Sequence, residues 1–288
     1  MFLMAAIGFS SCSSSDGNSA STGGGAPTVD GKQLKYVKVG STVTILDYDT
    51  EGRVLSLTTN GSKIVYSYSE SQVTKTTSSG SSSAKVVTYT LTNGRITQKI
   101  EKGASSSNGD LITTYEYDGN GYLISASYSG TESSSESYAK YTYTESKRTT
   151  YTWNDGNVET TTSDRIDTYT YTPTSGSAST NSSTSHGVDT YTYSSHTLTL
   201  PLFDMGDDSV LAWQGYFGRS CRNLPSKVQS VTQRESSESG SSSKSVSTST
   251  DTTEYVYSFN GNILEKVLVT YTSNSGSVNV ETIELSWN

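Results

Sequence analysis

Apolar and polar residues alternate along most of this chain, and tight turns break the alternation. From Lys32 onward the period is two, as in residues 64–68 (IVYSY) and 255–259 (YVYSF), and the intervening positions are mostly Thr, Ser or charged. Side chains on a strand point to alternate faces, so the pattern predicts strands with one buried and one wet face. A helix would need apolar residues at three- and four-residue spacing, which these segments lack.

Most of the tight turns share one theme, an aromatic residue before the turn and an aliphatic residue after it. Asn-Gly and Asp-Gly tolerate the positive φ angles of tight hairpins, and the flanking aromatic and aliphatic residues can pair across the strands. We interpret them as degenerate repeats of one hairpin unit. The clearest examples are residues 48–54, 92–96, 117–123 and 259–263.

Long Ser- and Gly-rich segments lie between many of these turns. Short and long connections alternate from about residue 69 to 138, which places tight turns at one end of a meander and long loops at the other. At 8–12 residues per strand and turn, the chain holds about 16–20 strands, and an open sheet that wide is unusual. The sequence therefore predicts an all-β, antiparallel up-and-down meander that closes or curls into a β-barrel, as a single domain over residues 32–288. The predicted long loops are 78–84, 103–109, 129–137 and 173–187.

One segment breaks the strand pattern, residues 201–225 (PLFDMGDDSVLAWQGYFGRSCRNLP). Its apolar spacing predicts a short helix near 206–218, capped by Asp208 or Ser209 and ended by Gly218. We interpret this segment as an insertion that plugs one barrel end or the lumen. The apolar residues that fit the helix are Val210, Leu211, Trp213, Tyr216 and Phe217.

Composition supports a folded chain with a thin, aromatic core. Hydrophobic residues make up only 31%, which could indicate disorder, but the chain has 21 Tyr and 3 Trp, and disordered chains are poor in aromatic residues. Tyr and Thr both favour strands. The net charge of −8 and a pI near 4.8 argue against nucleic acid as a partner, because phosphates would be repelled.

The N-terminus resembles a lipoprotein signal peptide. Residues 2–9 are apolar, the sequence FSSC follows at 9–12, and the chain then stays small and polar to about Pro27. This predicts a signal peptide over 1–11, a lipid on Cys12 and a flexible tether over 12–31. The apolar run is too short to span a bilayer as a helix. The predicted location is therefore the cell envelope, anchored to the outer membrane and either periplasmic or surface-exposed.

Two features depart from an ordinary signal peptide of this type. Phe9 lies where Leu is usual, and no Lys or Arg precedes Cys12, so the expected start lies upstream of Met1. The alternative is a short buried helix or strand with a chance Cys. With Cys12 acylated, Cys221 has no disulfide partner.

A family resemblance rests on the lipoprotein start, the Tyr-Asp-x-x-Gly hairpins and the segment GYFGRSCRNLPSKV at residues 215–228. Together they resemble Bacteroidetes lipoproteins of the DUF4595 type over about residues 32–288, and the hairpins alone also resemble YD-repeat proteins. The resemblance implies a porin-like fold and carries over no activity and no catalytic residues.

Residues with recognisable site chemistry are few. Residues 47–52 (DYDTEG) resemble the start of a calcium loop, but Thr58 occupies the twelfth position, where a bidentate acid is needed, so an acidic hairpin turn is the favoured interpretation. Asp204, Asp207 and Asp208 suit a helix N-terminus, with calcium as the alternative. His186, expected in a flexible loop, and His196 do not form a zinc cluster. We expect no metal, no cofactor and no catalytic residue.

Three functions follow as hypotheses. The first is a non-catalytic binding or structural module for a glycan or an envelope protein, with Trp153, Trp213 and Tyr216 as candidate ligand contacts; core or strand packing is the alternative for these three. The second is an outer-membrane pore, suggested by the alternating last strand, 281–288. The third is a glycan-acting hydrolase, which would need two close carboxylates. The direction of the apolar side chains distinguishes a soluble barrel from a pore.

Overall fold

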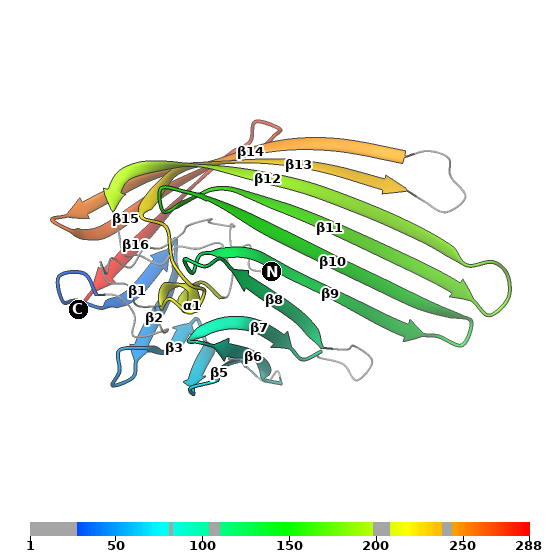
Figure 1. The fold of residues 1–288 in the computed structure, drawn as a ribbon, viewed down its shortest axis with the longest axis horizontal. Helices are drawn as coiled ribbons and strands as arrows, with labels where there is room; N and C mark the ends of the chain where they lie inside the picture. The colour runs from blue at the N-terminus through cyan, green and yellow to red at the C-terminus, as the bar shows by residue number, and fades with distance from the viewer. Residues whose placement is uncertain (1–27, 81–82, 104–109, 198–207, 238–243) are drawn as a thin grey trace.

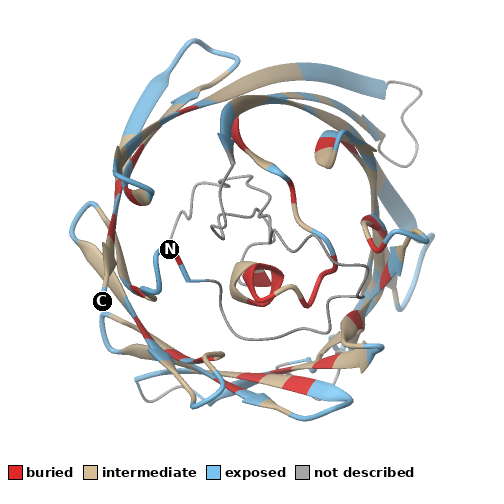
Figure 2. Ribbon diagram, turned by 60° about the vertical axis from the view of Figure 1, so that its left-hand side comes forward, coloured by how far each residue is buried: buried red, intermediate tan, exposed pale blue. Residues whose placement is uncertain are grey.

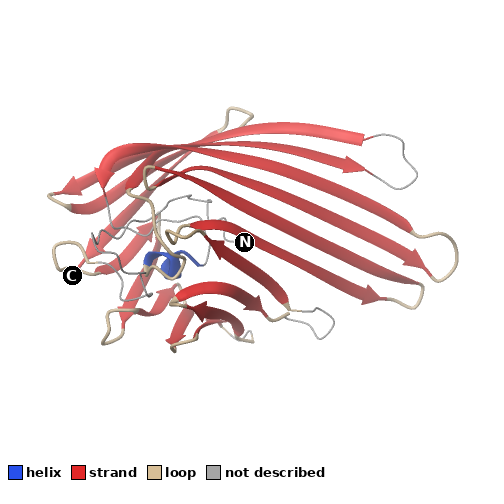
Figure 3. Cartoon of the chain, viewed as in Figure 1, coloured by secondary structure: helices blue, strands red, loops and turns tan. Residues whose placement is uncertain are grey.

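The computed structural model describes residues 28–80, 83–103, 110–197, 208–237 and 244–288. Each strand pairs antiparallel with its neighbours in sequence, and β1 closes on β16, so the sheet is a closed up-and-down barrel of 16 strands (Figures 1 and 3). The predicted fold is therefore confirmed, at the lower end of the expected strand number. No helix of the described ranges has the length and hydropathy to cross a membrane.

The strands of the barrel fall into a shorter set and a longer set. The shorter strands are β1 (Leu34–Val39), β2 (Thr42–Tyr48), β3 (Val54–Thr59), β4 (Ser62–Tyr68), β5 (Gln72–Ser79), β6 (Lys85–Thr92), β7 (Arg95–Glu101), β8 (Leu111–Tyr117), β15 (Ile263–Thr272) and β16 (Val278–Trp287). The longer strands are β9 (Leu123–Ser135), β10 (Ala139–Asn154), β11 (Asn157–Pro173), β12 (Ser179–Thr197), β13 (Asn223–Ser237) and β14 (Lys244–Asn260).

The long strands correct two of the predicted loops. Most of residues 129–137 belongs to β9, and β12 already begins at Ser179, which leaves only short connections at 136–138 and 174–178. Thr is a β-branched strand former, and the backbone ladder needs no apolar side chain, so these Ser- and Thr-rich segments continue the sheet. His186 accordingly lies on a strand and not in a flexible loop.

The longer strands run past the rest of the barrel. β8 pairs with β9 as far as Ser129, and β15 pairs with β14 from Thr252, so β9 to β14 continue beyond both points as a curved sheet. Figure 1 shows this part, here called the extension, reaching well past the helix α1 (Ser209–Trp213). The other end of the barrel carries the tight turns and both described ends of the chain, where Asn288 N donates to Gln33 O at 3.1 Å.

The hydrophobic core lies inside the barrel, around α1 (Figure 2). A barrel of this many strands is too wide for its own side chains to fill, so an inserted segment must complete the core. Leu211 is 0% exposed and Trp213 is 2% exposed, and both pack against inward residues of the short strands. The predicted plug is therefore present, although its helix ends at Trp213 and not at Gly218. Wall residues of this core include Val54, Tyr66, Val73, Tyr89, Ile96, Tyr115, Leu264 and Ile283.

The plug, residues 208–222, bonds to the tight turns through its backbone. Tyr216 O accepts from Ile96 N at 2.8 Å, Gly121 O accepts from Arg219 N at 2.9 Å, and Gly156 O accepts from Arg222 N at 2.9 Å. These bonds connect the plug to the hairpins β6–β7, β8–β9 and β10–β11. The plug, which belongs to the segment that breaks the strand pattern in the sequence, therefore holds these three hairpins together at this end of the barrel.

Aromatic side chains seal the same end. The last Tyr or Trp of every even-numbered strand except β6 donates a hydrogen bond to a backbone carbonyl near the start of the preceding strand. This explains why Tyr or Trp recurs near the ends of these strands, because it satisfies a carbonyl at the barrel rim. The bonds are Tyr48 to Leu34, Tyr68 to Val54, Tyr117 to Ile96, Trp153 to Leu123, Tyr193 to Val158, Tyr257 to Pro225 and Trp287 to Leu264, at 2.5–2.8 Å.

A glycine substitution tests how tightly the plug is locked. Gly218 has a φ of +84°, and an added Cβ would lie 2.4 Å from Gly121 O, a backbone atom that cannot swing away. Gly218→Ala should therefore lower the free energy of unfolding by at least about 3 kcal/mol. Gly261 has a φ of +62° with nothing within 4 Å of an added Cβ. Gly261→Ala is the control and should cost about 1 kcal/mol. If urea unfolding shows the same loss of stability for Gly218→Ala and Gly261→Ala, the plug is not packed tightly against Gly121.

Candidate functional site

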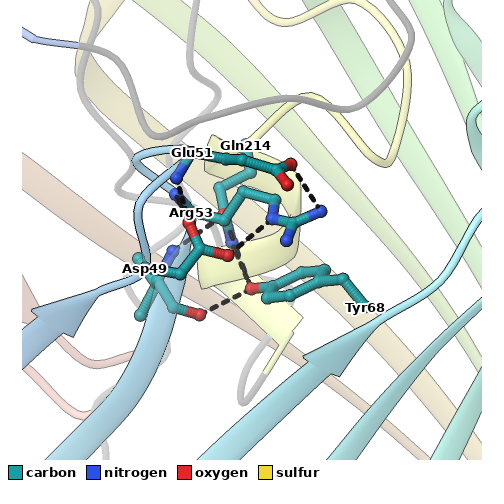
Figure 4. Close-up of polar contacts among 6 residues, drawn as sticks. Asp49, Glu51, Arg53, Tyr68 and Gln214 are labelled. Atoms are coloured by element: carbon teal, nitrogen blue, oxygen red, sulfur yellow. Dashed lines mark hydrogen bonds and ion pairs between the residues drawn. The ribbon is translucent and has the colours of Figure 1, made fainter.

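The acidic turn after β2 is a structural device and not the start of a cation site (Figure 4). Asp49 Oδ1 accepts from the backbone N of Glu51 and of Arg53, both at 2.9 Å, and Asp49 Oδ2 accepts from Arg53 Nε at 2.7 Å. Burial opposes ionisation of Asp49, but the hydrogen bonds from Arg53 outweigh it and lower the pKa of the carboxyl. Asp47 points to the other face and accepts from Ser56 Oγ at 2.8 Å.

Gln214 joins this turn to the plug. Its Oε1 accepts from Val54 N at 3.0 Å, and its Nε2 donates to Tyr68 Oη at 3.1 Å (Figure 4). The Arg53 guanidinium lies 4.6 Å from the centre of the Tyr68 ring. A buried amide with its partners in place fixes the plug at one orientation. The repeated Tyr-Asp-x-x-Gly pattern is therefore explained by barrel closure.

Asp208, the first residue of the plug, takes part in a buried ionic network. It occupies the N-cap position of α1 but makes no side-chain cap bond. Instead its carboxylate pairs with Lys99 Nζ at 2.9 Å and Lys75 Nζ at 3.5 Å, and it accepts a hydrogen bond from Tyr89. The expectation that helix capping explains this residue is thus corrected, because wall cations compete for the carboxylate. Asp204 and Asp207 lie outside the described residues.

Beyond the plug, the strands of the extension present a different inner face. On β10, Tyr151 packs against the core, and its register with β11 is unbroken outward to Ala139. Alternate residues therefore keep to the same side, and the inner side of this hairpin carries a mirrored run. The facing pairs, from the tip toward the plug, are Tyr141 and Tyr171, Tyr143 and Tyr169, Glu145 and Asp167, and Lys147 and Arg165.

This run, residues 141–147 and 165–171 on alternate positions, is here called the tyrosine face. Tyr143 donates to Asp167 Oδ1 at 2.6 Å, and Arg165 bridges Asp167 and Glu145, each at 3.0 Å. Nearer the tip, the ring centre of Tyr141 lies 5.3 Å from that of Tyr171. Polar groups with fixed directions therefore lie beside grouped aromatic rings.

The network keeps one protonation state around neutral pH. The hydrogen bond to Asp167 raises the pKa of Tyr143, and the hydrogen bond with Tyr138 raises the pKa of Tyr141 to about 12. The hydrogen bond with Tyr143 and the nearby carboxylates raise the pKa of Arg165. Tyr141 and Tyr143 thus stay neutral and Arg165 stays charged near neutral pH, so the hydrogen bond and ion pairs that they form persist there.

The outer face of the wall is rich in hydroxyls and charges. Facing Thr and Ser residues pair their hydroxyls, as in Thr170 with Thr180 at 3.2 Å. Ion pairs lie on the same face, at Lys38 with Glu284 (2.8 Å) and at Lys227 with Glu254 (3.6 Å). Exposed aliphatic residues such as Ile45, Val65, Ile112, Ile166 and Val256 alternate with these polar positions.

The structure places the three predicted ligand contacts at the plugged end. Trp213 is 2% exposed and Tyr216 is 4% exposed, both within the core. Trp153 is half-buried, donates to Leu123 O at 2.8 Å and packs against the ring of Tyr122. Packing, the alternative weighed for these residues, is thus their observed role here. Cys12 lies outside the described residues.

Other candidate groups stand apart from one another. His186 lies on the outer face, with Nδ1 2.7 Å from Asp164 Oδ1, and His196 stacks on Phe259. Cys221 is buried, and its Sγ accepts from Val158 N at 3.3 Å. Within the described ranges, no group of three or more His, Cys, Asp or Glu residues could hold a metal ion.

Sequence reasoning missed the tyrosine face as a site. The pairs Tyr141-x-Tyr143 and Tyr169-x-Tyr171 are visible as strand signals, but their mirrored order is the informative feature. In an antiparallel hairpin, mirrored order places like residues directly opposite each other. It would have identified Glu145 as the neighbour of Asp167.

The closed barrel with an inserted plug defines the class as a porin-like β-barrel. The family model described as "Domain of unknown function (DUF4595) with porin-like fold" matches residues 46–267, so the chain belongs to this family. The resemblance carried by residues 215–228 is therefore confirmed.

One of the solved structures compared with the chain shows the same fold, and a second is similar over most of its length. A porin-like protein from Bacteroides uniformis ATCC 8492 matches with a TM-score of 0.53 and 14% identity, over 91% of this chain and 99% of that chain. A porin-like protein from Bacteroides vulgatus ATCC 8482 matches with a TM-score of 0.46 and 14% identity, over 88% and 98%. None of the curated proteins compared with the chain matches it.

The ionic network at the front of the plug predicts a pH dependence of stability. Burial opposes ionisation of Glu101, but hydrogen bonds from Lys85 and Lys99 lower its pKa from 4.5 to about 2. A depressed carboxyl pKa stabilises the fold above the unfolded value, and this contribution is lost as the pH falls from about 4.5 toward 2. Up to about 3 kcal/mol should disappear over this window.

Urea unfolding at a series of pH values measures this loss. Glu101→Gln should be less stable than the parent protein at pH 6, and its stability should vary less between pH 4.5 and 2. If the difference between the two proteins is the same at pH 6 and at pH 2, Glu101 does not supply the acid dependence.

Proposed function

We propose that the chain is a non-catalytic binding module of the cell envelope, held to the outer membrane by a lipid on Cys12. The single observation that carries this proposal is that the two ends of the barrel differ in structure. One end holds the buried plug, and the other continues as a curved sheet whose inner face presents aromatic and charged side chains.

The residues on the outer face of the wall support the proposal that the barrel is surrounded by water and not by lipid. A membrane-spanning barrel needs a continuous apolar band around its outside. Here Lys38, Lys63, Glu116, Arg148 and Glu254 all lie on the outer face, in strands distributed around the ring. Charges at these positions would be costly in a bilayer, which favours anchoring by lipid over a pore.

The plug supports binding over conduction. Its buried side chains pack against inward wall residues at the level of α1, and its backbone bonds to three hairpin turns. A plug fixed in this way suits a scaffold that positions another surface. The tyrosine face is that surface in this proposal.

The position of the chain start supports an orientation. The first described residues lie at the plugged end, where Asp30 Oδ1 accepts from Asn262 Nδ2 at 3.5 Å. A tether over residues 12–31 would therefore meet the barrel at its plugged end. The extension then projects away from the lipid anchor.

Solubility and conductance test this proposal together. A Cys12→Ser variant, which cannot be acylated, should be monodisperse by sedimentation in detergent-free buffer. It should also leave the conductance of planar lipid bilayers unchanged. The parent chain should take up a labelled fatty acid in bacteria, and the variant should not. Channel currents, or aggregation without detergent, would instead favour the outer-membrane pore.

A further inference from the structure

We infer that the tyrosine face binds an uncharged oligosaccharide. The inference rests on the proposed function, since it names the ligand class of the same surface. It is carried by four observations: the tyrosines of the extension have no sealing role, their polar neighbours are fixed, the charges of the face balance, and the face lacks aliphatic residues.

The tyrosines of this barrel fall into two groups. At the plugged end, Tyr48, Tyr68 and Tyr117 each donate to a rim carbonyl and thereby hold strands together. On the tyrosine face, Tyr143 donates to a carboxylate, and Tyr169 is 41% exposed. Rings that neither fill the core nor seal the rim are left available for stacking on a flat, weakly polar ligand face.

The polar groups beside these rings are already aligned. Arg165 pairs with both Glu145 and Asp167, and Tyr128 donates a hydrogen bond to Glu145 Oε1, the oxygen that Arg165 also contacts. Each carboxylate keeps unused lone pairs that can accept from ligand hydroxyls. Fixed acceptors and donors beside an aromatic surface reduce the entropic cost of binding a ligand rich in hydroxyls.

The charges of the tyrosine face itself balance between acids and bases. It carries Glu145 and Asp167 beside Lys147 and Arg165, which gives no net field to attract a polyanion or a polycation. On the neighbouring inner positions, Glu132, Asp189 and Asp251 outnumber Arg234, which disfavours an anionic partner. An uncharged ligand is therefore favoured over nucleic acid or an acidic glycan.

The rest of the face excludes an apolar partner. The described inner positions of the extension carry no Leu, Ile, Val, Met or Phe; they carry Tyr, Ser, Thr, Asn, Gly and the charged residues above. A lipid or an amphipathic helix needs a continuous apolar surface, which this face does not offer. Aliphatic residues of the same strands, Ile166 and Val246, lie on the outer side.

The experiment compares the two faces of one hairpin. The full chain carrying Cys12→Ser is applied to an array of uncharged glycans (β-glucans, mannans, galactans and xylans) printed beside sulfated and uronic-acid glycans. Binding of at least one uncharged glycan and of no charged one is expected, followed by titration calorimetry with a soluble oligosaccharide of the bound type.

Four single substitutions then locate the site. Tyr141→Ala and Tyr169→Ala should each weaken binding at least about ten-fold, because each removes a stacking ring. Tyr169→Phe keeps the ring and should keep most of the affinity. Thr142→Ala, on the outer side of β10 next to Tyr141, is the matched control and should leave the affinity for the glycan unchanged. The three tyrosine variants lie outside the core, so their urea midpoints should equal that of the parent. Thr142→Ala removes a 3.4 Å hydroxyl contact with Ser133 and should lower the midpoint only slightly.

Two results would overturn the inference. One is binding restricted to charged glycans or to none, when the Cys12→Ser protein is soluble without detergent and the parent chain is acylated; the envelope module would then stand and its ligand class would be wrong. The other is an equal loss on Thr142→Ala and Tyr169→Ala. Failure of the proposed function itself would show separately, as channel currents or as aggregation without detergent.

Discussion

A closed wall of 16 strands encloses more space than its own inward side chains can fill, and this constraint governs the whole molecule. The chain meets it by inserting residues 208–222 into the lumen, where Leu211 and Trp213 complete a core that the wall only half supplies. Without that insertion, the apolar residues of the short strands would face water. The plug is thus what allows a chain with only 31% hydrophobic residues to bury a core.

The plug also makes the two ends of the barrel chemically different. Near it, aromatic side chains bond to rim carbonyls and Asp208 draws two lysines inward, so these donors serve to close the wall. Beyond it, the strands continue without a core, and their stability depends on the backbone ladder and on paired Thr and Ser hydroxyls. A side chain on the inner face of the extension is therefore under little packing constraint. Core packing therefore does not explain the aromatic residues at such positions, and the ligand contact that we infer would do so.

Much of this fold could be predicted from the sequence, because alternation and turn chemistry are local. Asn93 and Gly94 take positive φ as an Asn-Gly hairpin requires, and the helical segment was recognisable from its apolar spacing. Strand length was not predictable at 129–137 and 173–187, because low-complexity Ser and Thr stretches resemble loops until their partners are known. The roles of Asp208 and Trp213 depend on contacts with residues more than a hundred positions away, such as Lys75 and Lys99. No local pattern encodes those.

The tyrosine face can be recognised in the sequence only when two strands are compared, because neither strand shows it alone. Tyr143 and Tyr169 are ordinary strand residues when read one at a time. Their mirrored order around the 155–156 turn makes each face its like across the hairpin, and it brings Glu145 opposite Asp167. Two facing carboxylates would repel each other, and Arg165 compensates that repulsion by pairing with both. A core would not need such compensation, since apolar residues could occupy the positions. A surface that places paired acids and a shared cation beside exposed rings fits the hydroxyl-rich ligand that we infer.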